Sequence, residues 1–195
     1  MRWTLKPKPS EEQIKTLASA LGVNKIIATL LLQRGIETFE EAKAFFRPSL
    51  DELHDPYLMK DMDQAVERIE KAIAHKENIL VYGDYDVDGT TSVALLSSYL
   101  KTFYPNVATY IPDRYNEGYG VSYQGIDFAE DNGFSLIIAL DCGVKAIDKV
   151  AYASEKGIDF IICDHHRPGP ELPKAVAVLD PKRDDCLYPF KELCG

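Results

Sequence analysis

The sequence predicts an α/β protein with a mostly parallel sheet and helices on both of its faces, preceded by a small helical N-terminal region. From residue 79 onward, short apolar runs of strand length alternate with longer segments whose apolar residues recur at helical spacing. This alternation is the pattern of a parallel sheet wrapped by helices. Before residue 61 only helical patterns occur. We therefore expect a helical region at 1–60 and an α/β core at 61–195.

The N-terminal helices are predicted from their start signals. Each of two capping boxes precedes an apolar pattern of helical period: Ser10 with Gln13, and Thr38 with Glu41. A further helix is expected between them, from residue 24 to residue 35, and Pro48 stops the helix that starts after Thr38. One more, from residue 61 to residue 73, leads to the first strand. We interpret these helices as scaffold.

The core elements follow in order. The strand candidates are 79–82, 107–111, 136–140, 160–163 and 176–179, and the helix candidates are 90–103, 123–131 and 147–156. Gly133 and Gly157 follow the last two helices as C-terminal stops. Right-handed crossovers would bring the carboxyl ends of all the strands to one edge of the sheet. That edge is where open α/β sheets carry their chemistry.

The composition narrows the class of protein. A hydrophobic content of 46% and a charged content of 27% are typical of a soluble globular protein. No apolar run approaches the about 18 to 20 residues of a membrane span, and residues 1–7 lack an apolar signal core, so we expect a cytoplasmic protein without membrane contact. The four cysteines form no CxxC pair and are expected to be reduced thiols, with a structural zinc site as the less favoured reading.

Acidic residues gather where the predicted strands end. The first strand leads into Asp84, Asp86, Asp88 and Gly89; three later strands are followed by Asp141, by Asp164-His165-His166 and by Asp180. A single aspartate at such a place is more often a helix cap or a turn residue. Three carboxylates within five residues repel one another, however, and their convergence with two histidines favours a site for Mn²⁺ or Mg²⁺. The net charge of −9 does not exclude a nucleic-acid substrate, because bound cations neutralise these aspartates.

Two rival readings of the first motif fail. An Asp-x-Asp-x-Asp-Gly run also opens an EF-hand loop, which requires a bidentate glutamate at its twelfth position. Here that position is Leu95, inside an apolar helical pattern. A dinucleotide-binding loop fails as well, because no Gly-x-Gly-x-x-Gly follows the first strand and the sequence contains no P-loop.

The motifs resemble those of a known family. Gly-Asp-Tyr-Asp-Val-Asp-Gly at 83–89, Asp-Cys-Gly at 141–143 and Asp-His-His at 164–166 are similar, in this order, to the motifs of the DHH phosphoesterase superfamily. Residues 112–122 resemble the Arg and Glu-Gly-Tyr-Gly segment of one branch, the single-strand-specific exonucleases, and residues 32–48 also fit that branch. The resemblance extends over essentially the whole chain.

The resemblance implies an activity and its partners. It implies 5′ to 3′ degradation of single-stranded DNA in recombination and repair, with Mn²⁺ or Mg²⁺ as cofactor and two ions in the intact protein. Water activated by the ions would attack the phosphodiester in line. The implied partners are single-stranded DNA, a single-strand-binding protein and a helicase.

The same resemblance implies roles for individual residues. The implied metal ligands are Asp86 on the first ion, Asp88 and His165 on the second ion, and Asp141 between the two ions. The implied catalytic residues are these four together with Asp84 and His166. The implied substrate-binding residues are Arg114, Tyr115, Tyr119 and His166. Asp84 would contact an ion through water or position the attacking water, and Asp164 would orient the histidines. The structural alternative is that residues 114–122 only form an ordered turn, for which Gly118 and Gly120 permit unusual backbone angles.

Two departures from the family pattern limit what it implies. The superfamily often has a histidine four residues before the first aspartate of its Asp-x-Asp pair, and here Tyr82 stands there. Members also continue into a fourth motif with another metal-binding aspartate, whereas this sequence stops at residue 195, so we expect an N-terminal fragment with an incomplete site and reduced or absent activity. A phosphoesterase for short oligonucleotides, cyclic dinucleotides or pyrophosphate, and a non-catalytic DNA-binding or scaffold relative, remain as alternatives.

Overall fold

The structure is a computed structural model that describes residues 3–195. The chain forms two compact units that join, in the sequence, between Leu53 and His54. Each unit has a core of its own. Residues 54–60, which the sequence prediction counts with the helical region, belong to the second unit, where Met59 packs against Cys186 and Tyr188.

The first unit is helical. It contains α1 (Glu11–Leu21), α2 (Lys25–Leu32), α3 (Phe39–Phe46) and the short 3₁₀ helix η1 (Leu50–Glu52). Both predicted capping boxes are present, at Ser10 and at Thr38, and Asn24 caps α2. The helix from residue 24 ends at Leu32, earlier than the predicted residue 35. The small core consists of Ile14, Leu17, Ala28, Leu31, Ile36 and Ala42.

The second unit is built on a sheet of five parallel strands, as the sequence predicts. After the 3₁₀ helix η2 (Pro56–Leu58) its elements are α4 (Met62–Ala74), β1 (Asn78–Gly83), α5 (Val87–Lys101), β2 (Val107–Tyr110), α6 (Tyr123–Asp131), β3 (Phe134–Leu140), α7 (Ile147–Glu155), β4 (Asp159–Cys163) and β5 (Ala177–Leu179). The strand order is β2-β1-β3-β4-β5. Every pair is parallel, so all the carboxyl ends lie at one edge.

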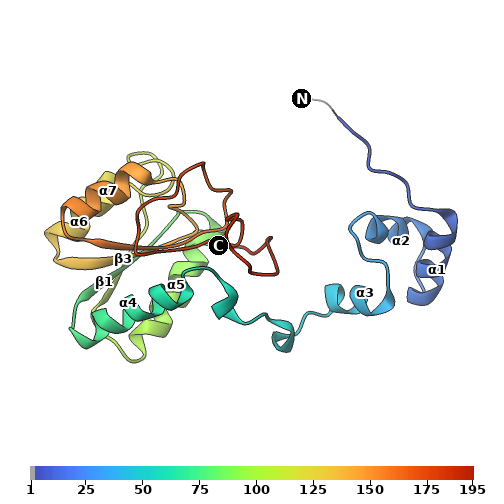
Figure 1. Cartoon of the computed structure of the whole chain (residues 1–195), viewed down its shortest axis with the longest axis horizontal. Coiled ribbons are helices and arrows are strands. Elements are labelled where there is room, and N and C mark those ends of the chain that lie inside the picture. The colour runs from blue at the N-terminus through green and yellow to red at the C-terminus, as the bar shows by residue number, and fades with distance from the viewer. Residues whose placement is uncertain (1–2) are drawn as a thin grey trace. The chain divides into compact units, whose positions relative to one another are not determined.

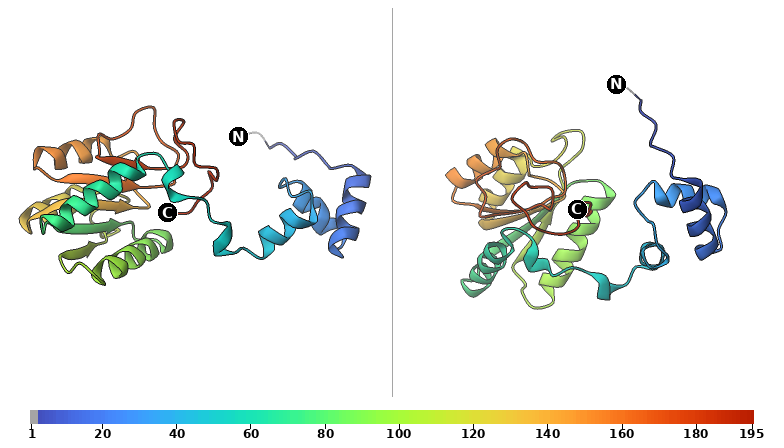
Figure 2. Two further views of the ribbon diagram at one scale, coloured as in Figure 1. Left: turned by 60° about the horizontal axis from the view of Figure 1, so that its bottom comes forward. Right: turned by 45° about the vertical axis from the view of Figure 1, so that its right-hand side comes forward.

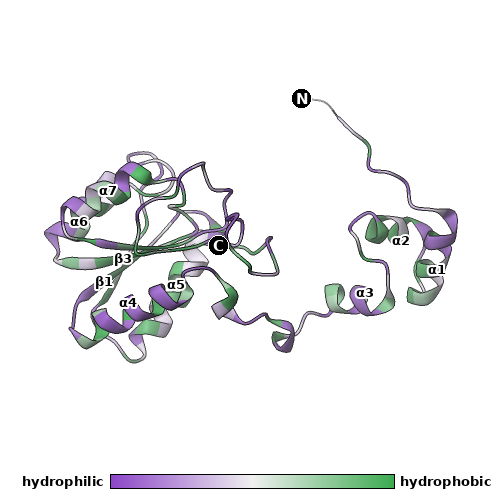
Figure 3. Cartoon of the chain, viewed as in Figure 1, coloured by the Kyte–Doolittle hydropathy of each residue, from purple (hydrophilic) through white to green (hydrophobic). Residues whose placement is uncertain are grey.

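Helices cover both faces of this sheet. Helices α4 and α5 lie on one face and α6 and α7 on the other (Figures 1 and 2). Alternate residues of β1 face the two layers: Ile79 and Val81 pack with α4 and α5, while Leu80 and Tyr82 pack with α6 and α7. The hydropathy colouring of Figure 3 shows the strands as hydrophobic and the covering helices as mixed.

One predicted boundary is wrong in an informative way. The helix expected from residue 90 begins at Val87, because the carboxylate of Asp86 accepts hydrogen bonds from the N–H groups of Asp88 and Gly89 and so caps the first turn. Asp88 therefore lies within α5 rather than in a loop before it.

Two composition-based expectations concern cysteines and membranes. All four cysteines are free thiols. Among the described helices no single one is long and apolar enough to cross a membrane, and the bent pair α1 and α2 meets that length and composition test only jointly.

Candidate metal centre

Four neighbouring strands deliver an aspartate to the same edge of the sheet. Asp84 follows β1, Asp141 follows β3, Asp164 follows β4 and Asp180 follows β5, and these strands are adjacent in that order. All four side chains are buried; Asp84 and Asp180 have no exposed surface at all. Four buried carboxylates side by side need compensating hydrogen bonds or positive charge.

The first motif, residues 83–89, packs closely on itself at the end of β1. A Cβ at Gly89 would come within 2.5 Å of the backbone oxygen of Asp84 and 2.7 Å of its nitrogen, so only glycine fits at this point. The first turn of α5 thereby packs directly on the end of β1. The carboxylates of Asp86 and Asp88 are held at the positive N-terminal end of the helix, and the N–H of Gly89 keeps the pKa of Asp86 below its ordinary value.

Asp141 lies at the centre of the group. Its backbone has φ = 59°, a left-handed conformation that few residues other than glycine adopt and that Asp and Asn tolerate best. Burial, with the charges of Asp86 and Asp88 next in importance, raises the pKa of Asp141 to about 6. The metal-free site therefore disfavours the third charge, and a cation would reverse that preference.

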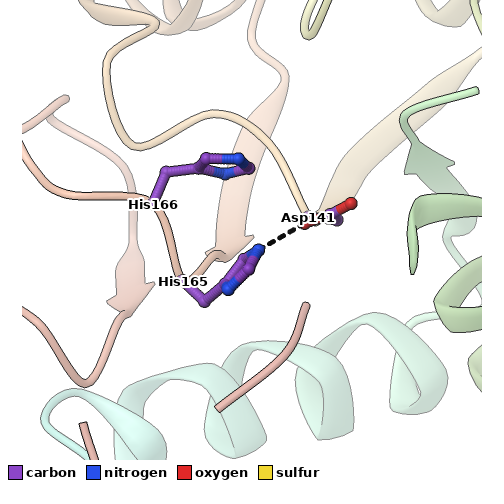
Figure 4. A group of neighbouring side chains, drawn as sticks. All are labelled: Asp141, His165 and His166. Carbon is purple, nitrogen blue, oxygen red and sulfur yellow. Dashed lines mark ion pairs between the residues drawn. The ribbon is translucent and has the colours of Figure 1, made fainter. Parts of the chain in front are cut away.

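His165 faces the carboxylates through Nε2. Its Nδ1 lies 2.9 Å from the carbonyl oxygen of Leu193, which can only accept a hydrogen bond, so Nδ1 carries the proton. In the neutral ring Nε2 is then a bare lone pair, 3.0 Å from Oδ1 of Asp141 and 3.7 Å from Oδ2 of Asp88. A metal ion would satisfy the facing lone pairs of Nε2 and of Oδ1 of Asp141, whereas Oδ2 of Asp88 accepts a hydrogen bond from the backbone N–H of Gly195 at 3.0 Å. Figure 4 shows the ring of His165 directed at Asp141.

Asp164 organises the two histidines. Its Oδ1 accepts hydrogen bonds from the backbone N–H groups of His165 and His166 and from Nδ1 of His166, and its Oδ2 accepts one from the N–H of Val144. Burial would raise the pKa of Asp164, but these donors together hold it below the ordinary value. With Nδ1 bonded to Asp164, the Nε2 of His166 lies 3.2 Å from the hydroxyl of Tyr119.

The segment after β2 adds aromatic and basic side chains beside this centre. The guanidinium of Arg114 lies over the ring of Tyr85, 5.4 Å from its centroid, and Tyr85 meets Tyr119 edge to face at 6.1 Å. Tyr119 in turn contacts His166. Tyr115 is 92% exposed and lies outside this chain of contacts. A cavity of about 260 Å³ adjoins the group and is lined by Tyr119–Val121, Cys142–Ala146, Lys149, Asp164 and His166.

The structure thus brings most of the sequence-predicted residues together. Ligand atoms of Asp141, His165 and His166 all lie within 4.8 Å of one another, and Asp86 and Asp88 act electrostatically on the same carboxylate. Sequence reasoning missed Tyr85, although its place between two aspartates of the motif was a usable signal. It also missed the carbonyl of Leu193, which no residue type could have revealed.

The donor set fits a hard divalent cation. Within residues 3–195, both carboxylate oxygens of Asp84 and both of Asp141 are buried without a hydrogen-bond donor, and Oδ2 of Asp180 is in the same state. Nε2 of His165 lies 3.0 Å from Oδ1 of Asp141, and in the tautomer with the proton on Nδ1 it has no hydrogen to donate. Carboxylates with an imidazole are a ligand set of Mn²⁺ and Mg²⁺.

The fold and the site define a class of protein: a parallel α/β domain with a candidate metal centre at the carboxyl edge of its sheet. The chain matches the DHH family, N-terminal domain, over residues 78–194, and it belongs to this family. The resemblance on which the sequence prediction rests is thereby confirmed. The match begins at β1 and includes every strand of the sheet.

Two relatives show how similar the chain is to known proteins. The single-stranded-DNA-specific exonuclease RecJ of Bacillus subtilis (strain 168) is 43% identical over 195 residues, which is 100% of this chain and 25% of that protein. RecJ of Escherichia coli (strain K12) is 33% identical over 172 residues, 87% of this chain and 29% of that protein. The chain thus spans between a quarter and a third of these relatives.

Solved structures agree with the fold. A crystal structure of exonuclease RecJ bound to manganese aligns with a TM-score of 0.61 and 31% identity, over 67% of this chain and 33% of the other. RecJ from Thermus thermophilus in complex with Mn²⁺ aligns with a TM-score of 0.67 and 25% identity, over 93% of this chain and 25% of the other.

Proposed function

We propose that this chain is the metal-binding part of an exonuclease that hydrolyses single-stranded DNA from 5′ to 3′ in recombination and repair. The observation that carries the proposal is the meeting of Asp141, the bare Nε2 of His165 and the carboxylate of Asp88 at one sheet edge. The 43% identity to a RecJ over the whole chain supports the substrate. Because the chain spans 25% of that relative, the activity is proposed for the full-length protein.

The proposed ligand assignment follows the geometry. Asp86 would hold one ion and Asp88 the other, Asp141 would bridge them from its central position, and His165 would complete the second through Nε2. Asp84 has two buried oxygens without donors and would hold water that an ion orients. The ions, Mn²⁺ or Mg²⁺, would supply Lewis acidity at the scissile phosphate and a lowered pKa of the attacking water.

The remaining residues would act on the substrate. His166, whose ring is fixed by Asp164 and whose side chain is 42% exposed, would contact a phosphate oxygen. Arg114 would add charge, while Tyr119, and more weakly the exposed Tyr115, would stack on bases, which is how proteins hold single strands without reading their sequence. Replacement of Arg114 by alanine is expected to weaken single-strand binding about tenfold, as measured by fluorescence anisotropy, with Mn²⁺ binding unchanged.

A product-length assay tests the proposal. The full-length protein with Mn²⁺ is incubated with a long 5′-phosphorylated single strand, with a duplex and with short di- and trinucleotides. Processive shortening of the single strand from its 5′ end is expected, and the D141N variant is expected to lose it. Asp131→Asn, a matched change at the exposed end of α6, is the control that keeps activity.

Other outcomes identify the alternatives. A protein that cleaves only the short substrates, cyclic dinucleotides or pyrophosphate is a small-substrate phosphoesterase. A protein whose melting temperature does not respond to Mn²⁺ is a non-catalytic DNA-binding relative. We further propose a cytoplasmic location, with a single-strand-binding protein and a helicase as partners; co-purification of these proteins with the full-length protein tests the latter.

A further inference from the structure

The side chain of Tyr82 occupies an unusual place for a polar group. It is a β1 residue with no exposed surface, and its ring stacks on Tyr110 of the neighbouring strand β2 at 5.3 Å. A Cβ at Gly125 of α6 would come within 2.6 Å of this ring, so the ring is tightly enclosed. Its position corresponds to the place where the superfamily often has a histidine, four residues before Asp86.

The hydroxyl of Tyr82 is engaged with the segment 113–122 rather than with the metal centre. It donates to the carbonyl oxygen of Gly120 at 2.9 Å and accepts from the backbone N–H of Ser122 at 3.1 Å. Burial raises the pKa of Tyr82 well above its ordinary value, so the phenol keeps its proton. Both bonds hold the far end of the segment on the sheet.

A second contact holds the near end of the same segment. Oε1 of Glu117 accepts from the backbone N–H of Asp113 at 2.7 Å, and Oε2 accepts from the hydroxyls of Tyr110, at 2.8 Å, and Ser122. Ser122 Oγ also caps α6 by accepting from the N–H of Gly125. The segment is therefore bonded to β1 and to α6 at its far end, and Glu117 ties its near end to Tyr110 of β2.

Two residues of this segment, Arg114 and Tyr119, lie beside the candidate metal centre. Arg114 lies over Tyr85, and the hydroxyl of Tyr119 lies 3.2 Å from Nε2 of His166. Gly118 and Gly120, with φ of 85° and 80°, allow the chain to turn on either side of Tyr119. The place of Tyr119 thus depends on where Tyr82 holds the backbone of the next residue.

We infer that Tyr82 is a positioning residue: its hydroxyl, together with Glu117, fixes the segment 113–122 so that Arg114 and Tyr119 face the metal centre, and it does not ligate a metal. The substrate part of this inference rests on the proposed function. The holding of the segment does not, because it follows from the hydrogen bonds alone.

The test compares Tyr82→Phe with Tyr104→Phe in the full-length protein. Tyr104 is also buried, and its hydroxyl also bonds a backbone carbonyl, that of Glu77, but it lies at the opposite end of the sheet. Both variants lose one buried hydroxyl, so their general stability should fall alike. Three quantities are measured: hydrogen exchange of the amides in 113–122, affinity for a single-stranded oligonucleotide, and affinity for Mn²⁺.

For Tyr82→Phe we expect exchange in 113–122 to rise about tenfold and oligonucleotide affinity to fall about tenfold, which corresponds to about 1.4 kcal/mol, roughly one lost hydrogen bond. Mn²⁺ affinity should stay within about twofold. Tyr104→Phe should change none of the three. Glu117→Gln, with exposed Glu130→Gln as its control, should loosen the same segment from its other end and covers the case in which Tyr82→Phe does not fold.

The other possible results either overturn or support the positioning role of Tyr82. Equal exchange of 113–122 in the Tyr82 and Tyr104 variants overturns the inference. A tenfold loss of Mn²⁺ affinity in Tyr82→Phe with unchanged exchange also overturns it, because Tyr82 would then belong to the metal site. Raised exchange in a protein whose unaltered form binds no single strand supports the positioning role and overturns the proposed function.

Discussion

Replacing Asp141 by asparagine should stabilise the metal-free protein at neutral pH while abolishing its response to metal. Asparagine has nearly the same shape, tolerates the left-handed backbone at φ = 59°, and removes the charge. No donor hydrogen bond is lost, because neither carboxylate oxygen has a donor among the described residues. The effect on stability is therefore dominated by the electrostatics of this one carboxylate.

The magnitude follows from the pKa of Asp141. Its ordinary value is 3.8 and the folded, metal-free site raises it to about 6, so the folded state binds this proton more tightly than the unfolded state does. Stability from this group is complete below about pH 4 and is lost as the pH rises through about 6. Above that, the loss approaches about 3 kcal/mol, whereas at pH 4.5 it is only about 1 kcal/mol.

Calorimetry of the full-length protein with a chelator measures this difference. For a unit of this size the expected rise in the melting temperature of D141N is up to about 10 °C at pH 7.5 and a few degrees at about pH 4.5. Saturating Mn²⁺ should raise the melting temperature of the unaltered protein and leave that of D141N unchanged. A gain that is the same at both pH values, or no gain at pH 7.5, would refute the electrostatic reasoning.

Two further predictions concern the scaffold of the site. Gly89→Ala should destabilise the protein by at least about 2 kcal/mol, because the new Cβ meets the backbone of Asp84, whereas Gly169→Ala, with nothing nearer than 3.6 Å, should change little in the same urea titration. Arg68→Ala should cost about 3 kcal/mol, because Arg68 is 8% exposed and its loss leaves the half-buried Glu77 without its 2.7 Å ion pair. Glu77→Gln in the same background should then recover part of that loss; no recovery would contradict the ion-pair explanation.

The sheet and its acidic edge could be predicted because they depend on local signals. Buried parallel strands are short apolar runs, and parallel pairing alone sends Asp84, Asp141 and Asp164 to one edge. The start of α5 was misplaced because the capping role of Asp86 competes with its reading as a free ligand, and spacing does not separate the two.

The contacts within the site could not be predicted because they join distant segments. The bond from His165 to the carbonyl of Leu193 involves a backbone atom that every residue has. In the sequence Tyr82 shows only as a departure from the family pattern, because its partners, the backbone of residues 120 and 122, depend on how the segment after β2 folds back. The type of a side chain tells which groups it can bind, whereas the packing of the folded chain decides which group it meets.

The hydrogen bond between His165 and Leu193 also places the chemistry of a histidine under the control of a backbone atom 28 positions along the chain. A change of side chain at residue 193 leaves its carbonyl oxygen in place, so such a change would keep the proton of His165 on Nδ1. A change that displaces the backbone there would release that proton and let Nε2 carry it instead. The tautomer of His165 is therefore encoded by the path of the chain around residue 193 and not by the type of any residue.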